Sequence, residues 1–234
     1  MRTESIDYAY EGLALRGFLA VEAERAPGVL VVHDAGGLSE NIKEKARRLA
    51  ALGYCAFALD LFGGGATVTD GMRRIGEIAS DLKRWRGLAN AGLDVLAKRR
   101  ECDAARLAAI GYCFGGTTVY ELERSGAALR GVVGFHSGLS TTAPKSDAKA
   151  YKGRVLVCIG ADDPFIKPEE RVAFEEEMRN AGVDWQMHLY GGTVHSFTSR
   201  EAGKRNNPAM RYSEAADKES WAAMQELFTA TLMA

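Results

Sequence analysis

The stretch Leu107-Ala108-Ala109-Ile110-Gly111-Tyr112-Cys113-Phe114-Gly115-Gly116-Thr117 decides the fold. An apolar run ends in a turn with glycines on both sides of Cys113, and a helical pattern follows. This order matches the strand, turn and helix of a nucleophile elbow, G-x-nucleophile-x-G, with cysteine in the place of the nucleophile. The pattern predicts that the Cys113 thiol projects above a sheet edge at a helix N-terminus, where free N–H groups favour the thiolate.

Outward from the elbow, apolar runs alternate with segments of helical period, which predicts an α/β fold with a mostly parallel, doubly wound sheet. An antiparallel hairpin of Ile6–Tyr10 and Leu13–Val21 precedes the alternation, with its turn at Glu11-Gly12. The further predicted strands are Gly28–His33, Cys55–Leu61, Arg106–Tyr112, Leu129–His136, Arg154–Gly160 and Asp184–Tyr190. The predicted helices are Asn41–Leu52, Asp70–Lys98, Gly115–Ser125, Pro168–Ala181 and Asp217–Leu232.

Length and composition narrow the function classes. The 234 residues fit one domain, residues 1–234, and 47% hydrophobic with 26% charged residues is ordinary globular composition. Thirty basic and 31 acidic residues give a net charge of -1, which excludes a field that attracts nucleic acid or an anionic membrane. No run reaches the roughly 18 apolar residues of a membrane helix, and the N-terminus lacks the apolar core of a signal peptide. We therefore expect a cytoplasmic protein with a small-molecule partner, of undetermined oligomeric state.

A thiol nucleophile needs a base, and the chain has four histidines. His195 lies in a glycine-rich loop after the last predicted strand, where this fold places its base. His188 lies within a strand and His136 ends one, where it could line the pocket, while His33 precedes a glycine-rich turn. The chain order of nucleophile, acid and histidine favours His195.

The acid that orients the base should follow a strand between Cys113 and His195. Ile159-Gly160-Ala161-Asp162-Asp163-Pro164-Phe165 offers two carboxylates there. Asp163 precedes a proline, which favours an extended backbone that can turn toward a neighbouring loop. We predict that Asp163 is the acid and that Asp162 caps the turn.

Two backbone N–H groups should hold the oxyanion of an acyl-transfer reaction. Phe114 follows the nucleophile, and Ala35 lies in the glycine-rich turn after a predicted strand. Two irregular segments, Phe62–Thr69 and Ser199–Ser213, are candidate pocket walls or ordinary surface loops.

The other cysteines have simpler interpretations. Cys55 and Cys158 lie in apolar runs and are predicted to be buried structural thiols, whereas Cys102 follows basic residues and is predicted to be a solvated loop thiol. The four cysteines show no zinc-type spacing, and we expect no metal site.

Three motifs together resemble the dienelactone hydrolase family within the α/β-hydrolases. They are Gly111-Tyr-Cys113-Phe-Gly-Gly116, Gly160-x-x-Asp163 with Pro168 shortly after, and His195-Ser-Phe-Thr. The cysteine elbow is the most specific of them, because most relatives of this fold carry serine there. The resemblance covers the chain from the first strand to the last helix. It implies a Cys113–His195–Asp163 triad, no inserted lid domain, small carboxylic esters or lactones as substrates, and no metal or organic cofactor.

Two further residues take roles from the same resemblance. In the namesake enzymes a glutamate after the third strand pairs with the resting thiol, and the matching position here is Asp34, one methylene shorter. Those enzymes also hold the substrate's carboxylate with arginines, one of them just after the catalytic histidine. Here Arg200 is near but one place off, so specificity for dienelactone itself is not supported.

The sequence therefore predicts an ester or lactone hydrolase that works through an acyl-enzyme. Two alternatives remain open at this point. The elbow could survive in a ligand-binding protein with Cys113 as a redox-sensing thiol. The same triad could also transfer acyl groups to an acceptor other than water.

Overall fold

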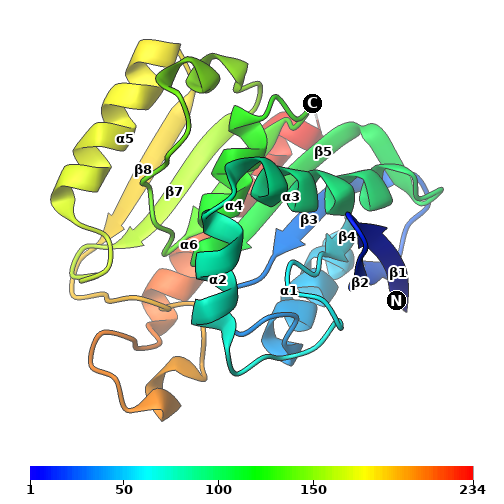
Figure 1. The fold of residues 1–234 in the computed structure, drawn as a ribbon, viewed down its shortest axis with the longest axis horizontal. Coiled ribbons are helices and arrows are strands. Elements are labelled where there is room, and N and C mark those ends of the chain that lie inside the picture. Colours follow the sequence, from blue (N-terminus) through cyan, green and yellow to red (C-terminus); the bar gives the residue numbers. More distant parts are fainter. Residues whose placement is uncertain (234) are drawn as a thin grey trace.

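The computed structural model describes residues 1–233, apart from the side chain of Arg205, and it contains one eight-stranded sheet. The strand order is β1-β2-β4-β3-β5-β6-β7-β8, and all neighbours from β4 to β8 run parallel (Figure 1). The antiparallel strands β1 and β2 form the N-terminal hairpin, and β2 pairs with β4. The strands are β1 Arg2–Tyr10, β2 Leu13–Val21, β3 Ala26–Val32, β4 Cys55–Ala58, β5 Cys102–Tyr112, β6 Gly131–Phe135, β7 Arg154–Gly160 and β8 Trp185–Tyr190.

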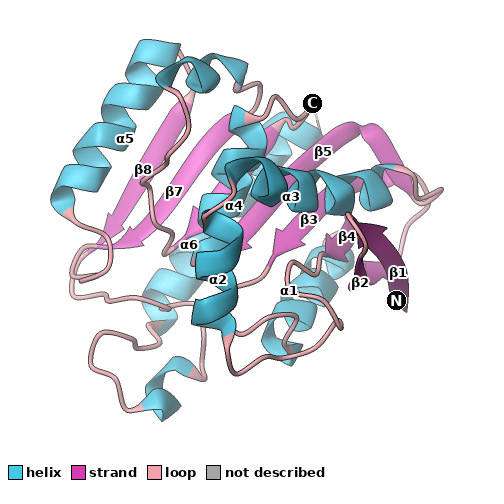
Figure 2. Ribbon diagram, viewed as in Figure 1, coloured by secondary structure: helices cyan, strands magenta, loops and turns pink. Residues whose placement is uncertain are grey.

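Helices cover both faces of this sheet (Figure 2). On one face α3, α4 and α5 pack against the strands, and on the other face α1 and α6 do so. Alternate residues of a strand enter the two cores: Leu30 and Val32 belong to one core, Val29 and Val31 to the other. The helices are α1 Glu40–Ala51, α2 Gly71–Ala79, α3 Leu82–Ala97, α4 Phe114–Arg124, α5 Pro168–Ala181 and α6 Glu214–Leu232.

The parallel register brings several loops to one edge of the sheet. Val32 pairs with Gly111, Tyr112 with Phe135, and Gly160 with Tyr190, so β3, β5, β6, β7 and β8 all end there. Ligands of open α/β sheets bind at this carboxyl edge. Between β6 and β7 the described chain carries only the 3₁₀ helix η1 (Lys145–Ala150), so no lid domain is inserted there.

The predicted fold is confirmed, but the single helix predicted over Asp70–Lys98 is wrong. The chain forms α2 and α3 instead, with a break at Ser80-Asp81. Asp81 is extended, with φ of -127°, and its carboxylate accepts a hydrogen bond from the N–H of Arg84 at 3.0 Å. This aspartate caps a new helix, a sequence signal that the continuous apolar stripe obscured.

The prediction for Cys102 is also wrong. This residue is only 8% exposed. Strand β5 begins at Cys102, four residues before the predicted strand Arg106–Tyr112, because Cys102 already pairs with Ala26 of β3. A hydrogen bond with Cys55 and burial raise the pKa of the Cys102 thiol. Cys55 and Cys158 are buried as predicted. In residues 1–233, no helix combines the length and apolar character needed to cross a membrane.

Candidate active site

The turn that carries Cys113 is a strained elbow between β5 and α4. Cys113 has φ of +53°, a left-handed value that side chains with a Cβ rarely adopt. A Cβ on Gly111 would lie 2.0 Å from the carbonyl oxygen of Gly115, and one on Gly115 would lie 2.2 Å from that of Val32. The flanking glycines are therefore required by close backbone approach, as the motif predicts.

The surrounding sheet and helix hold this strained residue. The N–H of Cys113 donates to the carbonyl of Phe135 on β6 at 3.0 Å, and its own carbonyl accepts from Gly116 at 3.0 Å. Cys113 is partly exposed and occupies the N-cap position of α4. The thiol therefore lies beside the positive end of the helix dipole and remains accessible to a small molecule.

His195 connects an acid to this thiol. Its Nδ1 lies 2.7 Å from an oxygen of Asp163, and Cys113 is close enough to His195 to raise the pKa of its imidazole. His195 and Asp163 are each only 4% exposed. The structure thus brings the three predicted residues together from loops after β5, β7 and β8.

Asp163 uses its two oxygens for two tasks. Oδ2 faces His195, and Oδ1 accepts a hydrogen bond from the N–H of Phe165 at 2.9 Å. The prediction that Asp162 caps this turn is therefore wrong: the Asp162 side chain is exposed, and Asp163 provides the cap. A carboxylate can do both because each oxygen accepts independently.

The environment of His195 favours its charged form. Burial lowers the pKa of His195, but hydrogen bonds to Asp163 and Cys113 outweigh burial and raise that pKa to about 9. A proton on Nδ1 is held by Asp163, so Nε2 is the ring nitrogen available for proton transfer. At neutral pH the imidazole therefore holds both protons.

Two N–H groups are placed where the oxyanion donors were predicted. Phe114 is the first residue of α4, and Ala35 lies in the loop between β3 and α1. Within residues 1–233 neither N–H has a hydrogen-bond partner. The first residue of α2, Gly71, packs directly against the loop of Ala35. A Cβ on Gly71 would lie 1.7 Å from the carbonyl oxygen of Ala35.

Sequence reasoning missed two residues that support the Ala35 loop. His33 is buried, accepts from the N–H of Leu61 at Nε2 (3.0 Å), and donates from Nδ1 to the Asp34 carbonyl (2.7 Å). Asp60 accepts from the N–H groups of its own glycine-rich loop, including Phe62 and Gly63, each at 2.9 Å. In the sequence, both residues could have been found as polar residues at the end of an apolar run that is followed by several glycines.

That glycine-rich loop, predicted as a pocket wall, lies behind the Ala35 loop. The N–H of Val68 donates to the carbonyl of Gly36 at 3.0 Å, and the N–H of Leu38 donates to that of Ala66 at 3.1 Å. Two hydrogen bonds therefore join the glycine-rich loop to the loop of Ala35, close to that residue.

The Asp34 carboxylate is engaged with its own turn. Its Oδ1 accepts from the N–H of Gly36 at 2.7 Å, and the side chain is half-buried. The thiol-modulating role of Asp34 stays a prediction.

Arg200 lies apart from the triad. It is exposed, and its guanidinium lies 5.5 Å from the ring centroid of Tyr212. It lines a pocket of about 700 Å³ between α1, α6 and the loop after His195, with Lys45 and Arg48 among its neighbours. None of the three triad residues lines that pocket, and the role of Arg200 toward a substrate carboxylate stays a prediction.

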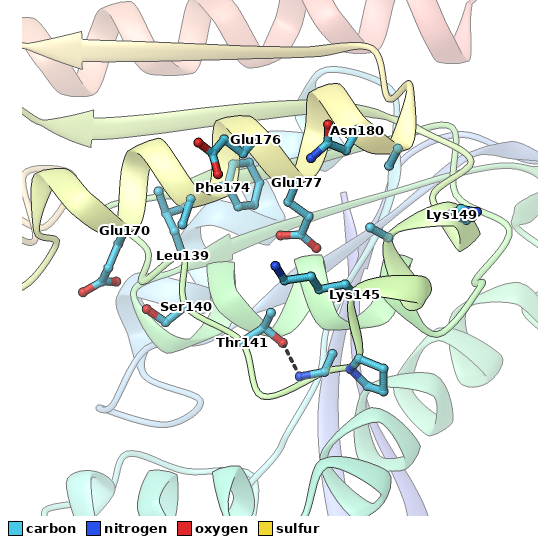
Figure 3. A pocket seen from close by; sticks show the side chains of 15 residues that line it. Leu139, Ser140, Thr141, Lys145, Lys149, Glu170, Phe174, Glu176, Glu177 and Asn180 are labelled. Atoms are coloured by element: carbon cyan, nitrogen blue, oxygen red, sulfur yellow. Dashed lines mark hydrogen bonds between the residues drawn. The ribbon is translucent and has the colours of Figure 1, made fainter.

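A second pocket, of about 460 Å³, lies between α5 and the segment that follows β6 (Figure 3). Leu139 and Phe174 point into it, while Lys145 and Glu177 supply charge at its sides. The triad does not line this pocket either. No group of three or more His, Cys, Asp or Glu side chains in residues 1–233 could hold a metal ion.

Comparison with known proteins identifies the family of this chain. The model of the dienelactone hydrolase family matches residues 15–232. This chain belongs to the dienelactone hydrolase family. The match spans the fold from β2 to the end of α6, and the family's α/β-hydrolase architecture is the one described above.

Three known proteins are similar to most of this chain. The solved structure of m3DLH is 42% identical with a TM-score of 0.95, covering 99% of this chain and 98% of that one. A dienelactone hydrolase-like promiscuous phosphotriesterase from metagenomic libraries is 38% identical with a TM-score of 0.94, covering 98% of each chain. Hydrolase tropI of Talaromyces stipitatus is 27% identical over 80% of this chain and 75% of its own. The chain is therefore a hydrolase.

Proposed function

We propose that this protein hydrolyses small carboxylic esters or lactones through a Cys113–His195–Asp163 triad. One observation supports this most strongly: His195 is hydrogen-bonded to Asp163, Cys113 raises the pKa of the same imidazole, and Cys113 sits on a strained elbow. Family membership supports the ester or lactone as substrate class.

The first half of the reaction forms an acyl-enzyme. The Cys113 sulfur, with its proton held by His195, attacks the carbonyl carbon, and the carbonyl oxygen becomes an oxyanion held by the N–H groups of Ala35 and Phe114. As the tetrahedral intermediate collapses, Nε2–H of His195 gives its proton to the leaving oxygen. The products are a thioester on Cys113 and a free alcohol, or the ring-opened hydroxyl of a lactone.

The second half returns the enzyme to its starting state. Neutral His195 takes a proton from water, and the hydroxide attacks the thioester carbonyl. The same two N–H groups hold the second oxyanion, the thiolate leaves, and the carboxylic acid is released. Asp163 fixes the tautomer of His195 throughout and stabilises the imidazolium each time it forms.

The test is hydrolysis of p-nitrophenyl acetate by Cys113→Ala. We expect kcat to fall by about 10⁴- to 10⁶-fold, because a nucleophile is lost from a site whose residues act together. The alanine removes crowding at the elbow, so the circular dichroism spectrum should not change. Cys158→Ala, the same substitution at a buried thiol of β7, is the matched control and should keep the wild-type kcat.

Two outcomes would contradict the proposal. Near wild-type turnover by folded Cys113→Ala would exclude Cys113 as nucleophile. Failure to release free acid in the absence of an added acceptor would favour acyl transfer over hydrolysis.

A further inference from the structure

His136 lies directly beside the proposed base. The ring centroids of His136 and His195 are 5.1 Å apart with the planes at 66°, an edge-on contact. The ring of Phe197 meets His136 in the same way, at 5.3 Å and 84°. His136 is 1% exposed, so its ring is buried against His195, and the option that it lines the pocket, which the sequence left open, is wrong.

The backbone at His136 is strained where β6 ends. His136 has φ of +42°, a left-handed value, and its N–H donates to the carbonyl of Cys158 at 2.8 Å. Glycine or asparagine would adopt this conformation at less cost. A non-glycine residue with strained backbone beside a reactive group is a reason to look for a function of its side chain.

The side chain of His136 holds the loop that carries His195. Its Nε2 lies 2.9 Å from the hydroxyl of Thr198, three residues beyond the base. The carbonyl of Thr198 also accepts from the buried Lys45 ammonium of α1 at 3.2 Å. Two side chains, His136 and Lys45, therefore hold the loop through Thr198. Of these two, His136 also contacts the ring of His195.

The groups around His136 keep it neutral. Burial lowers its pKa well below 6.5, and the nearby positive charges of His195 and Lys45 act in the same direction. The other titratable ring against it is Tyr112, at 6.1 Å, whose own pKa is raised by burial. A neutral ring thus lies beside a charged imidazolium and adds no repulsion to it.

We propose that His136 is a positioning residue: its ring holds His195 in the one orientation that meets Asp163 and Cys113 together. On the opposite side the ring of Phe165 approaches His195 edge-on, at 5.1 Å and 87°, but Phe165 is 53% exposed. The buried, fixed side of this sandwich is His136. The inference rests on the proposed function, because it assigns His195 the role of base.

Two substitutions separate the ring of His136 from its hydrogen bond. His136→Phe keeps an aromatic ring against His195 and loses the bond to Thr198. His136→Asn tolerates the left-handed backbone but has no ring, and its shorter side chain also gives up the bond to Thr198, a loss that His136→Phe shares. Thr198→Val removes the same hydrogen bond from the other side and leaves His136 in place.

The readouts are kcat on p-nitrophenyl acetate and the pH profile of Cys113 alkylation by iodoacetamide. For His136→Asn we expect kcat to fall about 10- to 100-fold, since a misplaced catalytic group costs rate steeply. Its alkylation profile should move to higher pH, because a displaced imidazolium stabilises the thiolate less. His136→Phe and Thr198→Val should stay within about threefold of wild-type kcat, with the alkylation profile in place.

The inference is overturned if His136→Asn keeps wild-type kcat and pH profile. It is also overturned if all three variants lose kcat equally without moving the profile, since that result describes a general packing role. Failure of the proposed function looks different: the wild-type protein would then show no Cys113-dependent ester hydrolysis at all.

Discussion

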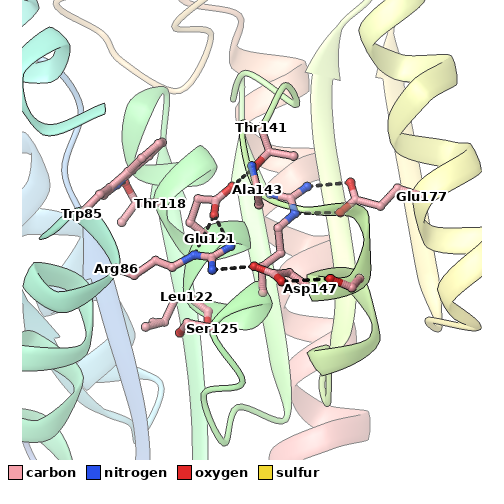
Figure 4. A network of polar contacts seen from close by, with 12 residues as sticks. Trp85, Arg86, Thr118, Glu121, Leu122, Ser125, Thr141, Ala143, Asp147 and Glu177 are labelled. Atoms are coloured by element: carbon pink, nitrogen blue, oxygen red, sulfur yellow. Dashed lines mark hydrogen bonds and ion pairs between the residues drawn. The ribbon is translucent and has the colours of Figure 1, made fainter. Parts of the chain in front are cut away.

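The two ends of helix α4 carry polar groups in two opposite environments. At its N-terminus Cys113 is strained, partly exposed, and lies beside N–H groups without partners. Toward its C-terminus Glu121 and Arg124 are almost completely buried and paired with charged neighbours. Figure 4 shows this network, with Glu121, Arg86 and Glu177 labelled. Arg86 donates twice to one oxygen of Glu121, at 2.9 and 3.0 Å, and Arg124 makes a two-point contact with Glu177, both at 2.7 Å.

This difference shows that buried charge alone does not identify a reactive site. The C-terminal cluster is satisfied internally: Glu121 accepts from Arg86, Arg124 and the Thr141 hydroxyl. Such a network, which also includes the pair of Arg86 with Asp147 of η1, holds α3, α4, α5 and η1 together, and its charges are satisfied by one another. The N-terminal end keeps strain and free donors, which are useful only when a ligand arrives.

The largest effect that should sharpen this contrast is at Asp163. Asp163→Asn removes the charge that fixes the tautomer of His195, and we expect a loss of about 10⁴-fold in kcat, the size seen for the equivalent change in a serine protease. Asp162→Asn, at the exposed neighbouring carboxylate, is the matched control and should change kcat less than about twofold. Steady-state kinetics on p-nitrophenyl acetate measures both. Equal losses in two folded proteins would contradict the assignment of the acid.

At the other end of α4, Glu121→Gln should damage stability and spare catalysis. Removing one charge from a buried ion network leaves Arg86 and Arg124 without their full partner, so urea unfolding should report a loss of about 3 kcal/mol. The exposed pair of Glu175 with Arg179 offers the control Glu175→Gln, which should cost less than about 0.5 kcal/mol. A large fall in kcat for folded Glu121→Gln would contradict the distinction between a structural C-terminal end of α4 and a reactive N-terminal end.

Glu123, also near this end of α4, should show a pH-dependent effect. Burial raises its pKa to about 7, although the N–H of Lys152 donates to it at 2.9 Å. Since the folded pKa lies above the unfolded value of 4.5, stability is fully present below about pH 4.5 and is lost as pH rises through 7. Glu123→Gln should therefore be more stable than wild type at pH 8 by a few kcal/mol, on the order of 3 at most.

The test of Glu123 is urea unfolding at pH 8 and again near pH 4.5. The difference between Glu123→Gln and wild type should disappear at the lower pH. A constant difference at both values would mean that its titration contributes nothing.

The smallest effect is expected at Asp34, beside the oxyanion loop. Asp34→Asn removes a negative charge and keeps an acceptor for the N–H of Gly36, so alkylation of Cys113 at a given pH should speed up about two- to fivefold. The effect is small because Oδ1 is already engaged. Rates of iodoacetamide labelling followed by mass spectrometry measure it. An unchanged profile would leave Asp34 only its place in the turn.

The sequence determined the local features whose cause is local. Glycines at 111 and 115 are needed wherever the backbone comes so close to itself, so the elbow and Cys113 were identifiable from spacing. Strand and helix periods likewise predicted the parallel sheet, and chain order selected His195. The sequence also contained a signal for the break at Ser80-Asp81, because Asp81 is a typical N-cap residue. The continuous apolar stripe on either side led to the prediction of one helix.

Only the tertiary structure decided which side chains meet across loops. Asp163, which the following proline already favoured in the sequence, also provides the turn cap predicted for Asp162, because its two oxygens satisfy Phe165 and His195 at once. Cys102 is buried because its sulfur occupies the space beside Gly28, which has no side chain. The contact of His136 with His195 joins residues 59 positions apart through the register of β6, β7 and β8. Spacing along a chain predicts backbone geometry, whereas contacts between loops depend on how whole strands align, which no single segment encodes.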